Sequence, residues 1–209
     1  MYAVRPEFGP TLPELLSGRS KAWRYALIGG YVVVLVVVLY LLLLRGDPTS
    51  TDVHKGGNVP FQLTYDAALK SKTPIGDERL RLEGTRGRLV TVDPLELPAY
   101  NGQSDGFLPV YAETLIPEMQ KQYKDFELRR EGRTSVNRIP GYEIVFQYTT
   151  EEGKTAYGRR ILLLNSYSAG ARDGVDVLLL EGRSSVVPNA DAVGAAGSLK
   201  TLLRSFRFN

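Results

Sequence analysis

The feature that most constrains this chain is an apolar run of 19 residues, Ala26 to Leu44, which contains no charge and no proline. A helix of that length spans ~28 Å, close to the ~30 Å hydrocarbon core of a bilayer. Such a helix satisfies its own backbone polar groups in lipid. The sequence therefore predicts a transmembrane helix over residues 25–45, with the lipid bilayer as the partner of Ala26–Leu44.

The charges that flank this run predict its orientation. Arg19, Lys21 and Arg24 precede it with no acid among them, whereas the charges that follow sum to zero over residues 45–57. Lys and Arg near a membrane span favour the cytoplasmic side. We therefore expect residues 1–24 to be a cytoplasmic segment and the remainder of the chain to be extracytoplasmic.

The alternative to an uncleaved anchor is a cleaved signal peptide. A signal peptide has an apolar region of roughly 7–15 residues that ends at small residues, but this run is longer and is followed by RGDPTSTD. The chain has no cysteine, which excludes lipoprotein processing at a cysteine. The pattern favours a signal anchor in a bacterial cell membrane.

The rest of the chain divides into a linker and one domain. Residues 46–57 are polar and contain Pro48, Gly56 and Gly57, which predicts a linker. Residues 58–209 carry 20 basic and 19 acidic residues. A nucleic-acid-binding domain would carry a concentrated basic excess, so we expect no nucleic-acid partner.

The domain predicted for residues 58–209 has the patterning of an α+β fold. Apolar and polar residues alternate over 61–66, 80–83 and 142–148, which is typical of half-buried strands. Residues 149–154 predict a hairpin connection. Residues 108–123 have helical spacing, and Pro117 should kink or split that helix. A final helix is expected from Asn189, its N-cap, to Phe206. The whole predicts a curved antiparallel sheet covered by helices.

The second half of this domain resembles the PsbP-like fold. The segments that carry the resemblance are FELRREGRTSV, RIPGYEIVFQY, YGRRILLL, VDVLLLEG and a last helix ending in LKTLLRSFRF, all within residues 108–209. The first strand, FQLTYDAALK, departs from the family, which commonly places a proline and a tryptophan there. The resemblance implies an exported domain of actinobacterial type.

Catalytic and metal-binding motifs are missing from the sequence. His54 is the sole histidine and there is no cysteine, which excludes His-dependent triads, thiol nucleophiles and Cys/His zinc sites in the domain. Gly153-Lys154-Thr155 lacks the leading glycine of a P-loop. We therefore expect no catalytic residue, no cofactor, no metal and no enzyme activity, although a hydrolase that uses two carboxylates stays open.

Tyrosine and arginine supply the candidate binding surface. Alternating tyrosines on a strand either fill a core or line a cleft for a glycan, peptide or lipid, and arginine with tyrosine is also typical of protein-binding hot spots. The candidate residues are Tyr142, Tyr148, Tyr157, Arg129, Arg130, Arg159 and Arg160.

Three functional hypotheses follow from these features. The first is a membrane-anchored, non-catalytic extracytoplasmic protein that binds or assembles another envelope protein. The second is a carrier or sensor domain for a small envelope ligand. The third is the carboxylate-based hydrolase.

Overall fold

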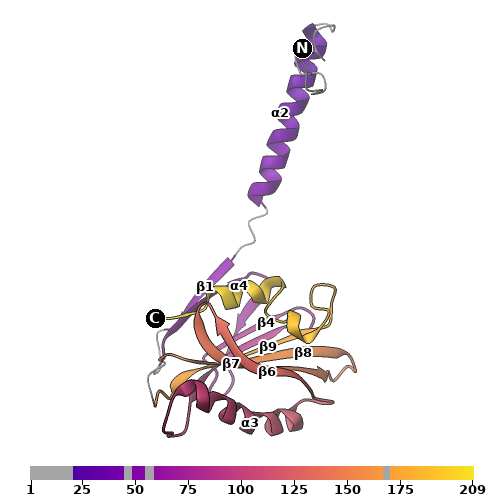
Figure 1. The fold of residues 1–209 in the computed structure, drawn as a ribbon. Coiled ribbons are helices and arrows are strands. Elements are labelled where there is room, and N and C mark those ends of the chain that lie inside the picture. The colour runs from indigo at the N-terminus through magenta and orange to yellow at the C-terminus, as the bar shows by residue number, and fades with distance from the viewer. Residues whose placement is uncertain (1–20, 45–48, 55–58, 167–169) are drawn as a thin grey trace, which may run out of the picture. The chain divides into compact units, whose positions relative to one another are not determined.

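The structure is a computed structural model that describes residues 21–44, 49–54, 59–166 and 170–209. The chain divides into two compact units, Met1–Asp47 and Pro48–Asn209 (Figure 1). The predicted cytoplasmic segment lies outside the described residues up to position 20. Each unit is treated by itself below.

The described part of the first unit is the helix α2, Lys21–Leu44. It begins before the predicted start at residue 25, because Lys21, Ala22 and Arg24 are good helix formers. Among the residues that the structure describes, no helix is both long enough and apolar enough to cross a membrane. The transmembrane assignment therefore stays a prediction.

The second unit is an α+β domain built on antiparallel strands. Strand order is β1-β2-β10 in a small sheet and β3-β4-β5-β9-β8-β7-β6 in a curved seven-stranded sheet (Figure 1). The predicted fold class is thus confirmed for this domain. Its elements are β1 (Thr49–His54), β2 (Phe61–Asp66), β3 (Leu69–Lys72), β4 (Leu80–Gly84), β5 (Leu89–Glu96), α3 (Ser104–Gln122), β6 (Glu127–Val136), β7 (Ile139–Thr149), β8 (Thr155–Leu164), β9 (Asp173–Gly182), the 3-10 helix η1 (Ala190–Ala192), α4 (Gly197–Ser205) and β10 (Arg207–Phe208).

Two apolar cores lie on opposite faces of the seven-stranded sheet. Successive strand residues point to opposite faces, so Ile144 and Phe146 of β7 pack toward α3, whereas Val145 packs toward α4, η1 and β2. The alternation predicted from the sequence therefore serves two cores and not one, and both faces of the central strands are covered (Figure 1).

The segment predicted as a linker, residues 46–57, contains strand β1. Residues Thr49 to His54 pair antiparallel with β2 in a continuous register. Thr49, Thr51 and Val53 are β-branched and favour a strand, and β2 offers an open edge with which they pair. The expectation of an unstructured linker is wrong for these six residues.

The helix predicted from Asn189 to Phe206 is two separate helices. Asn189 caps the short η1, where its side-chain oxygen accepts from the Ala192 amide at 3.1 Å. Gly194 and Gly197 then adopt φ values of +72° and +64°. These left-handed conformations interrupt a helix, and α4 begins only at Gly197.

Helix α3 is continuous through Pro117, so it is not split as predicted. A proline removes the amide that would donate to the carbonyl four residues earlier, which here belongs to Glu113. Both residues lie on the exposed side of the helix. The carbonyl of Glu113 can therefore be hydrated, which explains why the helix tolerates this proline.

Candidate functional site

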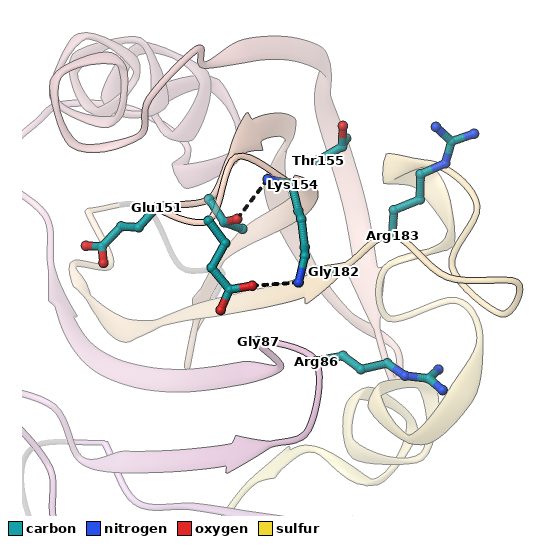
Figure 2. A pocket seen from close by; sticks show the side chains of 9 residues that line it. Arg86, Gly87, Glu151, Lys154, Thr155, Gly182 and Arg183 are labelled. Atoms are coloured by element: carbon teal, nitrogen blue, oxygen red, sulfur yellow. Dashed lines mark hydrogen bonds and ion pairs between the residues drawn. The ribbon is translucent and has the colours of Figure 1, made fainter.

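An open pocket of about 660 Å³ lies where three turns of the seven-stranded sheet meet (Figure 2). The turns are the β4–β5 turn, the β7–β8 hairpin and the end of β9, and we call this hollow the hairpin-end pocket. It is lined by Arg86, Gly87, Thr150, Glu151, Glu152, Lys154, Thr155, Gly182 and Arg183.

Backbone hydrogen bonds hold the three turns together. The amide of Gly182 donates to the carbonyl oxygen of Arg86 at 3.2 Å. The amide of Arg183 donates to the carbonyl oxygen of Thr155, also at 3.2 Å. A Cβ atom at position 182 would lie 2.7 Å from the Arg86 carbonyl oxygen. Glycine at this position therefore lets the end of β9 approach the β4–β5 turn closely. This contact fixes the backbone positions of Arg86 and Arg183.

The β4–β5 turn places Arg86 in an unusual conformation. Arg86 and Gly87 have φ values of +63° and +67°, as in the tight turns that suit twisted hairpins. Glycine adopts this conformation freely, but an arginine there costs about 1–2 kcal/mol. The turn thus projects an arginine from a position that asparagine or glycine would fill with less strain.

Among the described residues, two of the three cations that line the pocket have no acidic partner. Lys154 Nζ lies 2.6 Å from Glu152 Oε2, and this hydrogen bond lowers the pKa of Glu152 and raises that of Lys154. Arg86 and Arg183 are exposed, and within the described part of the chain their side chains form no ion pair. In Figure 2 they extend away from Glu151.

This arrangement is suited to binding an acid. A guanidinium group presents a planar fork of donors that matches a carboxylate. Of the residues that the structure describes, no group of three or more His, Cys, Asp or Glu side chains could hold a metal ion.

The three tyrosines of the predicted binding surface lie on two different faces of the sheet. Tyr142 is buried and Tyr148 half-buried on the α3 side, where Tyr148 packs on Phe146. Tyr157 is buried on the other side, and its hydroxyl donates to the carbonyl of Pro188 at 2.9 Å. Of the two interpretations that the sequence left open, core filling holds for Tyr142, whereas Tyr157 is part of a core and also lines a pocket.

The four predicted arginines are also divided. Arg130 and Arg159 both bind the buried carboxylate of Glu143. Arg160 lies on the α3 face and pairs with Asp176 at 2.6 Å. The remaining residue, Arg129, is exposed and pairs with Glu127 at 2.8 Å.

The seven predicted residues therefore form no single surface, and none of them lines the hairpin-end pocket. Two of them, Arg129 and Tyr157, do line one smaller pocket of about 380 Å³ beside η1. Strand parity separates Arg159 from Arg160, and a bulge between Leu128 and Arg130 shifts the register of β6. Arg86 and Arg183 were missed because the sequence reveals turns but not which turns meet. The sequence did carry one signal for this site, namely a basic residue, Arg86 or Arg183, at each of two chain turns.

No protein-family model matches the chain, and no curated protein matches it. Several solved structures match it at low identity, and two of them are described here. LpqN of Mycobacterium tuberculosis, involved in cell envelope biogenesis, has 10% identity and a TM-score of 0.50, over 79% of this chain and 94% of its own. CyanoP, the cyanobacterial PsbP of Synechocystis sp. PCC 6803, has 9% identity and a TM-score of 0.50, over 78% and 94%. These matches confirm the resemblance found in the sequence: the chain has a PsbP-like fold.

Proposed function

We propose that this chain is a single-pass membrane protein whose extracytoplasmic domain binds another envelope protein without catalysis. The partner presents an acidic segment, and the hairpin-end pocket receives it. The observation that carries the proposal is the pair Arg86 and Arg183, exposed and without an acidic partner among the described residues, on turns fixed by backbone hydrogen bonds.

The backbone positions of these two arginines are fixed before a partner binds. Arginine is enriched among residues that dominate protein–protein affinity, and rigid positioning lowers the entropy that binding costs. The strained backbone of Arg86 is consistent with a functional position, because strain of this kind concentrates at binding sites. The third cation, Lys154, is already paired with Glu152 and contributes less.

The proposed location rests on α2 and on the fold. The described apolar side chains of α2, from Tyr31 to Tyr40, are all exposed. A helix that is apolar on every side suits a lipid environment, and Arg19, Lys21 and Arg24 favour a cytoplasmic N-terminus. The likeness to LpqN, a protein of cell envelope biogenesis, agrees with an envelope role.

Cross-linking in membranes followed by mass spectrometry tests the proposal. The full chain is compared with the double variant Arg86→Glu/Arg183→Glu and with the control Lys70→Glu/Lys72→Glu, which makes the same charge change on exposed residues of β3. We expect the arginine variant to lose a protein partner by at least about tenfold, since a charged hydrogen bond contributes ~1.5–3 kcal/mol. The control should retain that partner.

Two results would contradict the proposal. One is recovery of lipid alone, with no protein above background. The other is an equal loss of the partner in both double variants, which would mean that net charge and not the pocket governs the interaction.

A further inference from the structure

A basic pocket lies beside α4, on the face of the seven-stranded sheet opposite to α3. Its volume is about 340 Å³, near the lower end of the ~300–1,000 Å³ that small-molecule sites occupy. We call it the α4 pocket. The residues that line it are Ser135, Val136, Asn137, Arg159, Gly194, Ala195, Lys200, Leu203 and Arg204.

Hydrogen bonds from side chains to the backbone join the segments that form this pocket. The side-chain amide of Asn137, in the β6–β7 turn, donates to the carbonyl of Phe206 at the end of α4, at 3.0 Å. Arg159 of β8 donates through Nη1 to the carbonyl of Val193 at 3.1 Å, directly before Gly194. The walls of the pocket are therefore fixed relative to one another.

The lining of the α4 pocket carries three basic residues and no acidic one. The charge of Arg159 is compensated by the carboxylate of Glu143. Among the described residues, neither Lys200 nor Arg204 forms an ion pair. Two positive charges of this lining are therefore uncompensated, and a concave site with one sign of charge concentrates ions of the opposite sign.

Helix stability does not account for this pair of cations. Lys200 and Arg204 are four positions apart on α4, so they lie on the same side of the helix, where like charges repel each other. Arg204 is in the last turn, where the helix dipole favours a cation. Lys200 is in the first half of α4 and gains nothing from the dipole. An anion between the two side chains would remove their repulsion.

The pocket also contains hydrogen-bond donors that suit an oxyanion. Nη1 of a guanidinium carries two N–H groups, and Arg159 uses one of them for Val193. Within the described part of the chain the second has no acceptor. Ser135, whose hydroxyl is a further donor, lines the same pocket. A phosphate group supplies both the negative charge and the acceptor oxygens that these donors require.

The position of α4 in the domain favours a lipid as the source of that phosphate. Helix α4 lies against β2, where Thr64 donates to Ser205 Oγ at 2.8 Å, and β2 pairs with β1 (Figure 1). Four residues separate Leu44, the last residue of the predicted span, from Thr49 of β1. Such a connection reaches at most ~18 Å, so a bilayer that holds the span keeps this part of the domain near lipid headgroups.

We propose that the α4 pocket binds the phosphate group of an anionic membrane lipid and so docks the domain onto the bilayer. Lys200 and Arg204 attract the headgroup, and Arg159 and Ser135 donate to its oxygens. The inference rests on the membrane anchor proposed above. It does not depend on the protein partner of the hairpin-end pocket, which is lined by other residues.

The test places the full chain in lipid nanodiscs, so that its anchor stays in a bilayer. One set of discs contains phosphatidylcholine alone, and the other contains equal parts of phosphatidylcholine and phosphatidylglycerol. A fluorophore on Thr201→Cys, at an exposed position of α4, is quenched by nitroxide groups on the lipid headgroups when the domain docks. We expect docking to be at least about tenfold more favourable with phosphatidylglycerol, as a charged hydrogen bond implies.

Two double variants provide the matched comparison. Lys200→Gln/Arg204→Gln should lower docking about tenfold or more, whereas Lys70→Gln/Lys72→Gln, which removes the same charge from exposed residues of β3, should leave it unchanged. Equal quenching in both kinds of disc, or an equal loss in the two variants, would overturn the proposal.

Competition separates the lipid from other anions. Millimolar inorganic phosphate should leave the domain docked on phosphatidylglycerol. Release by that phosphate would assign the pocket to a free phosphate compound, and release by a micromolar glutamate-rich peptide would assign it to an acidic protein; either result overturns the lipid proposal. Arg86→Glu/Arg183→Glu should dock normally, so a failure of the hairpin-end pocket to bind a protein is distinguished from a failure here. Loss of docking in that variant would place the lipid site outside the α4 pocket.

Discussion

Replacing Glu143 with glutamine should destabilise the domain far more than the same change at an exposed glutamate. Glu143 lies on β7 with 2% of its side chain exposed. One carboxylate oxygen contacts Arg130 Nη1 at 2.5 Å, and the other accepts from Arg159 Nε at 2.8 Å. Arg159 also donates to the carbonyl of Val193 at 3.1 Å. The buried carboxylate therefore joins the sheet to the segment that carries η1.

The size of the expected stability loss follows from how exposed each arginine partner of Glu143 is. Arg159 is 14% exposed, so loss of the carboxylate leaves its charge buried and uncompensated, which costs about 3–5 kcal/mol. Arg130 is 47% exposed, so its pair adds little. Because the glutamine amide and Val193 still accept hydrogen bonds, we expect a loss near the lower limit, about 3 kcal/mol. For a domain of this size that lowers Tm by about 6–12 °C.

Chemical and thermal unfolding of the purified full chain checks this value. The control is Glu127→Gln on β6, whose ion pair with Arg129 is exposed on both sides, at 53% and 43%. It should cost less than about 1 kcal/mol. If the two variants lose the same stability, the Glu143 pair is not energetically buried and the reasoning fails.

Two further predictions concern the core and the neighbouring carboxyl groups of Asp93 and Asp176. Gly158→Ala should destabilise the domain by about 1–3 kcal/mol, because a Cβ there would overlap the Phe146 ring directly opposite; Gly106→Ala on α3, where the space is open, is the control, and equal unfolding free energies for the two variants would refute the clash. Burial, with the neighbouring Asp176 charge as the second cause, raises the pKa of Asp93 above 3.8, and burial also raises the pKa of Asp176. A raised carboxyl pKa in the folded state means that its contribution to stability is complete below pH 3.8 and is lost as pH rises through the folded-state value. Asp93→Asn should therefore flatten the decline in Tm above pH 3.8, Glu96→Gln should not, and parallel profiles for wild type and Asp93→Asn would contradict this assignment.

The elements that the sequence predicted well are those with a strong local signal. The alternation Phe61-Gln62-Leu63 predicted strand β2 correctly, because its apolar side chains all point to the buried face of that strand. The final helix was misjudged because apolar spacing alone does not reveal that Gly194 and Gly197 adopt left-handed conformations. Strand β1 was missed because its pairing depends on the edge of β2 and not on its own polarity.

The candidate site was harder to predict, because it depends on which segments meet. The parity of Arg159 and Arg160 places them on opposite faces, which a strand assignment alone implies. The pairing of Asp93 with Asp176 depends on β9 lying beside β5, although 83 positions of sequence separate these residues. Arg86 and Arg183 line the same pocket because Gly182 lets the end of β9 approach the β4–β5 turn closely.

The central claim, an extracytoplasmic binding domain on a membrane anchor, is tested most directly by labelling single cysteines. The chain has no cysteine, so each introduced thiol is the sole target of a membrane-impermeant maleimide. Ser185→Cys, at an exposed position of the domain, should be labelled in intact cells, and Ser20→Cys only after lysis. The opposite pattern, with Ser20→Cys labelled in intact cells and Ser185→Cys protected until lysis, would contradict the account and place the domain in the cytoplasm.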